Sequence, residues 1–236
     1  MKKSLFSLCA VALLGHVAMA GGDIAPVVPV VAEEEVQDYF YAGGGLVYNR
    51  VYSVDSGWFD DGIATQDETL GLTGIIGYEY NRYIAIEGRV SKSMWERDYA
   101  DVTTWSIFLK PQYQFRDDDE IGRTDDGFWT VYALLGFGNS NVEGSSGDNE
   151  YGAHPGVIGQ EIMDETGFQW GVGLSYTFID KPDDKHRFYR DSWSIFIDYT
   201  MTANDASIHS TLYEYDSNVY NELSTDGVTV GVTYKF

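Results

Sequence analysis

Two adjacent residues near the carboxyl end are of the types that carry out nucleophilic hydrolysis. They are His209 and Ser210, with Glu214 nearby. A serine nucleophile needs a base that reaches its hydroxyl, as in lipid-modifying hydrolases. Neighbouring residues of a strand point to opposite faces, so His209 is poorly placed to serve Ser210, and the segment is expected to be a loop. We therefore predict no enzyme activity, and a lipid-modifying enzyme is the least favoured function.

The remaining histidines and acids do not have the spacing of a metal site. His154 precedes a proline in a glycine-rich stretch and His186 lies in a charged one, so no pair of histidines has metal-ligand spacing. Acidic clusters occur at residues 60–61, 117–120, 125–126 and 183–184. Carboxylates suit calcium or magnesium, but none of these clusters has the spaced pattern of a dedicated calcium loop. We predict no metal and no cofactor, and leave open whether acidic loops bind divalent cations.

The charge of the chain excludes a nucleic-acid binder that relies on phosphate neutralisation. Aspartate and glutamate number 37 against 15 lysines and arginines, which gives a formal net charge of −22 at pH 7. Proteins that bind nucleic acids present clustered lysine and arginine, the opposite of this balance. Aromatic residues make up 15% of the chain and glycines number 26. This composition favours many strands over an acidic disordered tail.

The first 37 residues lie outside the predicted folded domain. Residues 1–20 combine a basic start, a short apolar run and an A-x-A cleavage signature, which is typical of a secretory signal peptide. The only cysteine, Cys9, lies inside this segment, so we expect no disulfide in the exported chain. Residues 21–37 contain two prolines and an acidic run, which predicts a disordered extension.

The rest of the chain, residues 38–236, has the periodicity of β-strands. Apolar and polar residues alternate in stretches of roughly ten, the length that a tilted strand needs to cross a bilayer. We predict eight strands, at about 38–53, 69–81, 83–97, 102–116, 128–139, 167–179, 191–203 and 226–236.

The alternation favours strands whose apolar face meets lipid. In the last strand the apolar face consists of Val228, Val230, Val232, Tyr234 and Phe236. Apolar faces of this kind, aliphatic in the middle with aromatic residues towards the ends, are typical of membrane strands. A soluble sandwich or lipocalin would carry charged residues on its water-facing side. The opposite faces here are mainly glycine, serine, threonine and glutamine, which suits a narrow lumen.

The connections between strands differ in length. Long polar connections are predicted at 54–68, 140–166 and 204–225, whereas residues 80–83 form a tight turn. Short turns on one side and long loops on the other predict an all-β, closed antiparallel up-and-down transmembrane barrel. Closure leaves no strand edge with unpaired backbone groups in hydrocarbon. Longer connections at 116–127 and 180–190 keep a ten-stranded barrel as an alternative.

Over residues 38–236 the chain resembles the small eight-stranded outer-membrane barrels, the family of the outer-membrane protein A barrel domain and the opacity-type adhesins. The matching segments are residues 40–46, 77–81, 86–88, 109–113, 197–199 and 231–236. The resemblance implies insertion into a Gram-negative outer membrane, with residues 21–37 in the periplasm. It also implies that Tyr234 and Phe236 belong to a carboxyl-terminal signal read by the barrel-assembly machinery.

Four charged residues are predicted to point into the lumen. Continuing the alternation places Glu87 and Arg89 inward, with Lys110 and Asp198 inward on other strands. Buried charges persist when they are paired. The resemblance implies that these residues form a salt-bridge network that plugs the lumen. Its role is either structural packing or a gate, and a lumen only wide enough for side chains favours packing.

These observations favour a monomeric, non-enzymatic protein with a structural and surface-interaction role through long outer loops. Loop residues expected to make contacts are Trp58, Phe59, Tyr213 and Tyr215. The expected partners are outer-membrane lipids and lipopolysaccharide, the barrel-assembly machinery and a host or surface ligand, with no nucleic acid. The alternative function is a narrow porin-like channel for ions or small solutes, and a lipid-A-modifying outer-membrane enzyme of similar size is the least favoured function.

Overall fold

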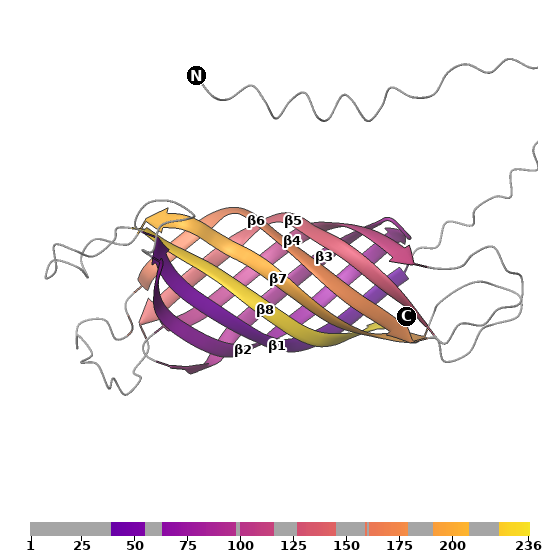
Figure 1. Cartoon of the computed structure of the whole chain (residues 1–236), viewed down its shortest axis with the longest axis horizontal. Helices are drawn as coiled ribbons and strands as arrows, with labels where there is room; N and C mark the ends of the chain where they lie inside the picture. Colours follow the sequence, from indigo (N-terminus) through magenta and orange to yellow (C-terminus); the bar gives the residue numbers. More distant parts are fainter. Residues whose placement is uncertain are drawn as a thin grey trace, which may run out of the picture. The chain divides into compact units, whose positions relative to one another are not determined.

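The chain folds into a closed barrel of eight antiparallel strands, seen from the side in Figure 1. The computed structural model describes residues 39–54, 63–97, 100–115, 127–144, 159, 161–178, 191–207 and 222–236. The strands are β1 (Tyr39–Val54), β2 (Ile63–Asn81), β3 (Ile84–Glu96), β4 (Ala100–Phe115), β5 (Gly127–Gly144), β6 (Glu161–Phe178), β7 (Ser192–Ser207) and β8 (Glu222–Lys235). Within these ranges no helix is long and apolar enough to cross a membrane.

Each strand pairs with its neighbours in the sequence, and β8 pairs with β1 to close the barrel. The alternation in the sequence therefore predicted the strand number correctly, and the ten-stranded alternative is wrong. The barrel has two ends. We call the end where β1 begins and β8 finishes the terminal end, and the opposite one the far end. A tight turn at Arg82 and Tyr83 joins β2 to β3 at the terminal end.

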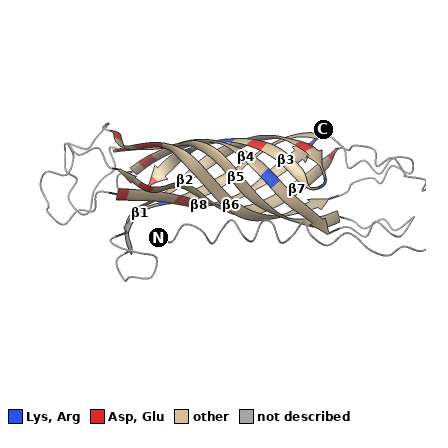
Figure 2. Cartoon of the chain, turned by 90° about the horizontal axis from the view of Figure 1, so that it is seen from above, with Lys and Arg blue, Asp and Glu red and all other residues tan. Residues whose placement is uncertain are grey.

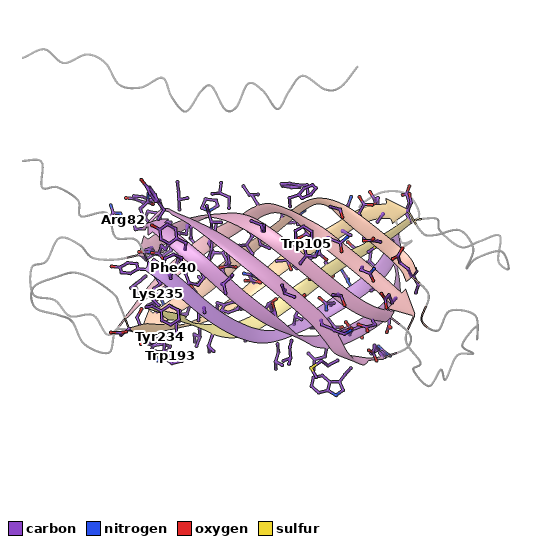
Figure 3. All side chains as sticks on the ribbon, turned by 180° about the vertical axis from the view of Figure 1, so that it is seen from behind. Phe40, Arg82, Trp105, Trp193, Tyr234 and Lys235 are labelled. Atoms are coloured by element: carbon purple, nitrogen blue, oxygen red, sulfur yellow. The ribbon has the colours of Figure 1, made fainter. Side chains whose placement is uncertain are left out.

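The outward face of the barrel is an apolar band. Its middle is aliphatic, with exposed residues such as Ile76, Ile107 and Val230. At the terminal end the band is bordered by aromatic rings in contact, including Trp193 with Tyr234 at 4.8 Å between ring centroids. Figure 3 shows Phe40, Trp193 and Tyr234 gathered at this end. Exposed apolar side chains in a continuous belt with an aromatic border are the surface that lipid requires.

The strands continue beyond this band at the far end, into segments predicted to be loops. Residues 63–68, 140–144, 161–166, 204–207 and 222–225 are strand. The prediction failed there because the polarity of the alternation reverses: outward residues such as Glu143, Asp164 and Glu222 are exposed, while Val142 and Leu223 are buried inside. Figure 2 shows acidic residues gathered at the end of the barrel opposite the carboxyl terminus.

Candidate functional site: a charged network across the lumen

The lumen is bridged near its middle by an ion pair between strands on opposite walls. Arg89 of β3 donates two hydrogen bonds to the carboxylate of Asp198 of β7, at 2.9 Å from Nη1 and 2.7 Å from Nη2. The Nε of the same guanidinium donates to Glu87, two residues earlier on β3. Both carboxylates are buried. Planar two-point pairing of this kind fixes the orientation of the arginine as well as neutralising its charge.

Glu87 also joins two further groups to the network. Its Oε2 atom accepts hydrogen bonds from the Tyr41 hydroxyl at 2.6 Å and from the Lys110 ammonium at 2.9 Å. The ammonium lies 4.1 Å from the centroid of the Tyr132 ring, a cation–π distance. Tyr132 in turn donates its hydroxyl proton to Asp198 at 2.9 Å. Two cations, two carboxylates and two phenols therefore form one continuous network.

Glycines on the lumen wall make room for the aromatic members of this site. A Cβ atom at Gly77 would overlap the ring of Tyr41, and one at Gly173 would overlap the ring of Tyr132. Gly77 lies directly across the β1–β2 ladder from Tyr41. The absent side chains let two large rings lie flat against the wall of a narrow barrel. The site therefore depends also on Gly77 and Gly173, which contribute by having no side chain.

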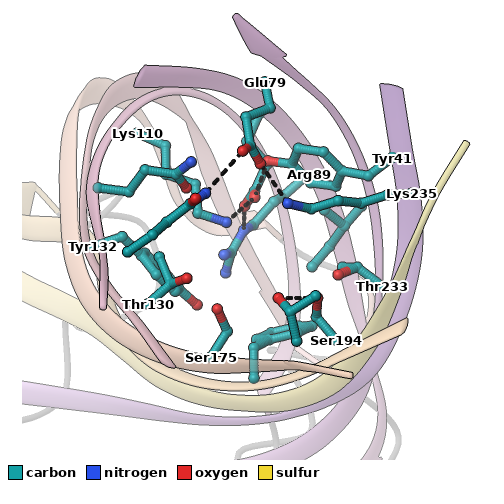
Figure 4. A pocket seen from close by; sticks show the side chains of 16 residues that line it. Tyr41, Glu79, Arg89, Lys110, Thr130, Tyr132, Ser175, Ser194, Thr233 and Lys235 are labelled. Atoms are coloured by element: carbon teal, nitrogen blue, oxygen red, sulfur yellow. Dashed lines mark hydrogen bonds and ion pairs between the residues drawn. The ribbon is translucent and has the colours of Figure 1, made fainter. Parts of the chain in front are cut away.

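A second ion pair lies nearer the terminal end. Lys235 of β8 donates to Oε2 of Glu79 at 2.7 Å, and Gln114 donates to Oε1 at 2.9 Å. Figure 4 shows Lys235, Glu79 and Lys110 around a polar cavity whose wall includes Arg89. The cavity volume is about 30 Å³, enough for one or two waters.

The charges of the Arg89 network and of the second ion pair balance. Glu87 and Asp198 face Arg89 and Lys110, and Glu79 faces Lys235, so each set is formally neutral. An uncompensated charge here would cost several kcal/mol, whereas a fully hydrogen-bonded pair has little net effect on stability. The arrangement can hold the two walls in register and obstruct the lumen. Among the described residues no group of three His, Cys, Asp or Glu side chains lies close enough to hold a metal ion.

The structure brings all four residues predicted for the lumen, Glu87, Arg89, Lys110 and Asp198, into this network. Sequence reasoning missed Tyr41, Tyr132 and Glu79 as partners. Their inward parity was readable from the alternation, but their distances depend on the stagger of the strands around the barrel.

Other predicted site residues lie elsewhere. Tyr234 donates to Asp191 at 2.8 Å, and the backbone N–H of Phe236 donates to the carbonyl of Phe40 at 2.9 Å. The loop candidates Trp58, Phe59, Tyr213 and Tyr215 lie outside the described residues. So do His154, His186, His209, Ser210 and Glu214, and all four acidic clusters at residues 60–61, 117–120, 125–126 and 183–184.

A family model for the outer membrane protein β-barrel domain matches residues 7–236, nearly the whole chain. The protein belongs to this family. It is therefore an integral protein of the bacterial outer membrane, in agreement with its apolar outer band. No curated protein matches the sequence of this outer-membrane barrel.

Several solved outer-membrane barrels are similar to it at low identity. Ail of Yersinia pestis, in complex with the heparin analogue sucrose octasulfate, is 16% identical over 85% of this chain and 99% of that chain, with a TM-score of 0.45. Neisserial surface protein A is 14% identical over 84% and 97% of the two chains, with a TM-score of 0.47. OprG of Pseudomonas aeruginosa is 15% identical over 85% and 97%, with a TM-score of 0.43.

Proposed function

We propose that this protein is a closed, monomeric outer-membrane barrel that meets other molecules through its far end rather than conducting solutes. The observation that carries the proposal is the network between β3 and β7. Arg89 and Asp198 meet across the lumen, with 2.7 Å between Nη2 and Oδ2. The cavity that Arg89 lines has a volume of about 30 Å³. A hydrated ion does not pass between directly hydrogen-bonded side chains unless they separate, and their separation exposes unpaired buried charge.

The far end supplies the surface for contact. Barrels of this type have short periplasmic turns and longer extracellular connections, so we place the turn at Arg82 in the periplasm and the far end outside. The strands there extend beyond the lipid band and expose polar and acidic side chains, including Glu143, Asp164 and Glu222. A surface held on paired strands is more rigid than a loop, which lowers the entropy lost on binding. An acidic surface favours cationic partners.

The lipid band and the carboxyl end define the other proposed partners. The exposed aliphatic belt contacts acyl chains, and lipopolysaccharide surrounds the far end of the band. Tyr234 and Phe236 are proposed as the signal recognised by the barrel-assembly machinery. The ring of Phe236 is exposed in the folded barrel, so packing in the lumen does not account for it.

Cell binding tests the surface role. Bacteria that express the native protein are compared with bacteria that express one of two variants. One variant replaces the loop residues Trp58, Phe59, Tyr213 and Tyr215 by serine, and the other replaces Glu143, Asp164 and Glu222 by the corresponding amides. We expect adhesion to host-cell or matrix-coated surfaces to fall to the level of cells lacking the protein. A control variant replaces four lipid-facing aromatic residues instead and should adhere normally. Equal adhesion by all strains, with equal amounts in the membrane, would refute the surface role.

A narrow channel is the second candidate. The polar cavity reaches the network itself, because Glu79, Lys110 and Arg89 line the same space. Separation of Arg89 from Asp198 would extend that cavity toward the far end. Ion conductance that changes when Glu87, Lys110 or Asp198 is replaced would favour this candidate over a purely structural network.

A further inference from the structure

The far end of the lumen contains a compact apolar layer that the charged network does not include. The members of this far-end apolar layer are all at most 3% exposed and come from six strands: Val51, Ala100, Val102, Val142, Ile162, Met163, Ala203, Ala206 and Leu223. Because β1, β4, β5, β6, β7 and β8 all contribute, the layer extends across the barrel interior rather than covering one wall.

The inward residues of β4 show how the lumen is stratified. From the far end they begin with Ala100 and Val102 and continue through Thr104, Ser106 and Phe108, all buried, to Lys110, which is partly exposed. Val102 belongs to the apolar layer, and Lys110 belongs to the charged network. Between them lie hydroxyls that bond to other strands, Thr104 with Ser91 and Ser106 with Gln169. The apolar layer is thus separated from the network by a polar layer and has its own set of contacts.

The outward side chains at the same height identify what surrounds this layer. Glu143 lies next to Val142 on β5, and Asp164 follows Met163 on β6, and both acids are exposed. Charged outward residues exclude hydrocarbon from this part of the surface. This part of the barrel therefore has water outside and an apolar core inside, the reverse of the membrane band.

We infer that the far-end apolar layer is a second seal of the lumen, independent of the Arg89 network, and that it excludes water and ions from the outer side. Two buried polar side chains border the layer, Asp67 of β2 and Ser93 of β3, and they accept hydrogen bonds from the backbone N–H groups of Ala100 and Val102. Water entering the layer would have to break these bonds, and an ion among the apolar side chains would lose its hydration without compensation. The polar cavity near Lys235 is then a blind pocket with respect to the far end. Opening the charged network alone produces no continuous pore.

Water access to Ser140 tests the seal directly. Ser140 is fully buried on the inner side of β5 and forms a hydrogen bond with Thr225. It is the next inward residue after Val142 in the direction of the terminal end. The variant Ser140→Cys, made in a Cys9→Ser background, is folded in lipid vesicles and exposed to a small cationic methanethiosulfonate reagent. We expect no labelling. Glu143→Cys, which is exposed on the same strand, should label fully and shows that the reagent is active.

The same cysteine is then examined in a barrel whose far-end apolar layer has smaller side chains, as a result of Ile162→Ala, Met163→Ala and Leu223→Ala. We expect complete labelling of Ser140→Cys in this background. The matched control reduces three lipid-facing side chains, Val172, Val230 and Met94, to alanine and should leave Ser140→Cys unlabelled. Labelling of Ser140→Cys in the otherwise native barrel would contradict the proposed seal. Absence of labelling in the triple alanine variant would contradict it as well. The heat-dependent shift in electrophoretic mobility confirms that each variant is folded.

Conductance gives a second, independent readout. The double variant Arg89→Ala with Asp198→Ala removes one charge of each sign and leaves Glu87 paired with Lys110. We expect no conductance from this double variant and none from the triple alanine variant of the apolar layer. We expect ion conductance only from a barrel that carries all five substitutions. Conductance from the double variant alone would contradict a second seal. Neither readout depends on what the outer surface binds, so loss of adhesion leaves this inference intact.

Discussion

Arg89 and Asp198 face each other from opposite walls of the barrel, on strands β3 and β7, and are joined by two hydrogen bonds of 2.9 and 2.7 Å. They are separated by 109 residues in the sequence. The pair therefore joins two walls directly, whereas the ladder hydrogen bonds link only adjacent strands. Both charges are buried, so water would not stabilise one of them if the other were removed.

Replacing Asp198 by asparagine is expected to lower the free energy of unfolding by about 3–5 kcal/mol, because Arg89 is then left with excess buried positive charge. Urea unfolding of the barrel in lipid vesicles measures this change. The control is Glu68→Gln, which breaks the exposed pair with Arg97 and should cost about 0–1 kcal/mol. Equal losses of unfolding free energy in the two variants would show that the buried pair contributes no more to stability than the exposed one.

Alanine at Gly77 is expected to destabilise the barrel by about 1–3 kcal/mol, because its Cβ displaces the Tyr41 ring and breaks the bond to Glu87. The same vesicle assay measures the effect. Gly74 provides a matched control on the same strand, since a Cβ there meets its nearest atom at 4.0 Å. Gly74→Ala should be neutral or stabilising by about 0.5 kcal/mol. Destabilisation by both variants to the same degree would assign the effect to the strand backbone.

Gln169→Ala is expected to loosen the far end of β7. Pairing of β6 with β7 stops at Trp170 and Met201. One residue beyond, the Gln169 amide donates to the carbonyl of Thr202 at 2.9 Å, replacing the ladder. Its loss should increase amide hydrogen exchange across residues 203–207, with no change in residues 192–200, as measured by mass spectrometry. Unchanged exchange in residues 203–207 would show that the amide does not hold β7.

Phe236→Ala is expected to reduce the fraction of protein inserted in the membrane, because it removes the exposed ring while the backbone N–H still bonds to Phe40. Heat-dependent mobility of membrane fractions measures the folded fraction. Phe178→Ala removes another exposed aromatic side chain from the terminal border and should insert normally. A similar deficit in both variants would indicate a general loss of interfacial contacts rather than a terminal signal.

The membrane part of the fold was predictable because its signal is local. Alternation between Val230 and Gly231, for example, is read from neighbouring residues, and it set both the strand and its inward side. The far-end extensions were missed because the same alternation carries opposite polarity there. Val142 points inward between Asn141 and Glu143, and in a short polar segment this pattern resembles a loop.

The charged network was predictable only in its composition. Parity identified Glu87, Arg89, Lys110 and Asp198 as inward residues. The phenol partners could not be assigned, since Tyr132 meets Asp198 only through the curvature and stagger of three consecutive strands. The plug formed by these four charged residues was expected from the family resemblance, whereas the far-end apolar layer was not predicted, because height along the lumen depends on register between strands distant in the sequence.

The most direct test of a closed barrel is the conductance of the native protein. Purified, folded protein without residues 1–20 is inserted into planar lipid bilayers, and the current is recorded at both polarities. The account predicts no current above that of the bare membrane, because the Arg89 network and the far-end apolar layer both obstruct the lumen. Stepwise openings from the native barrel, abolished by heat unfolding before insertion, would contradict it.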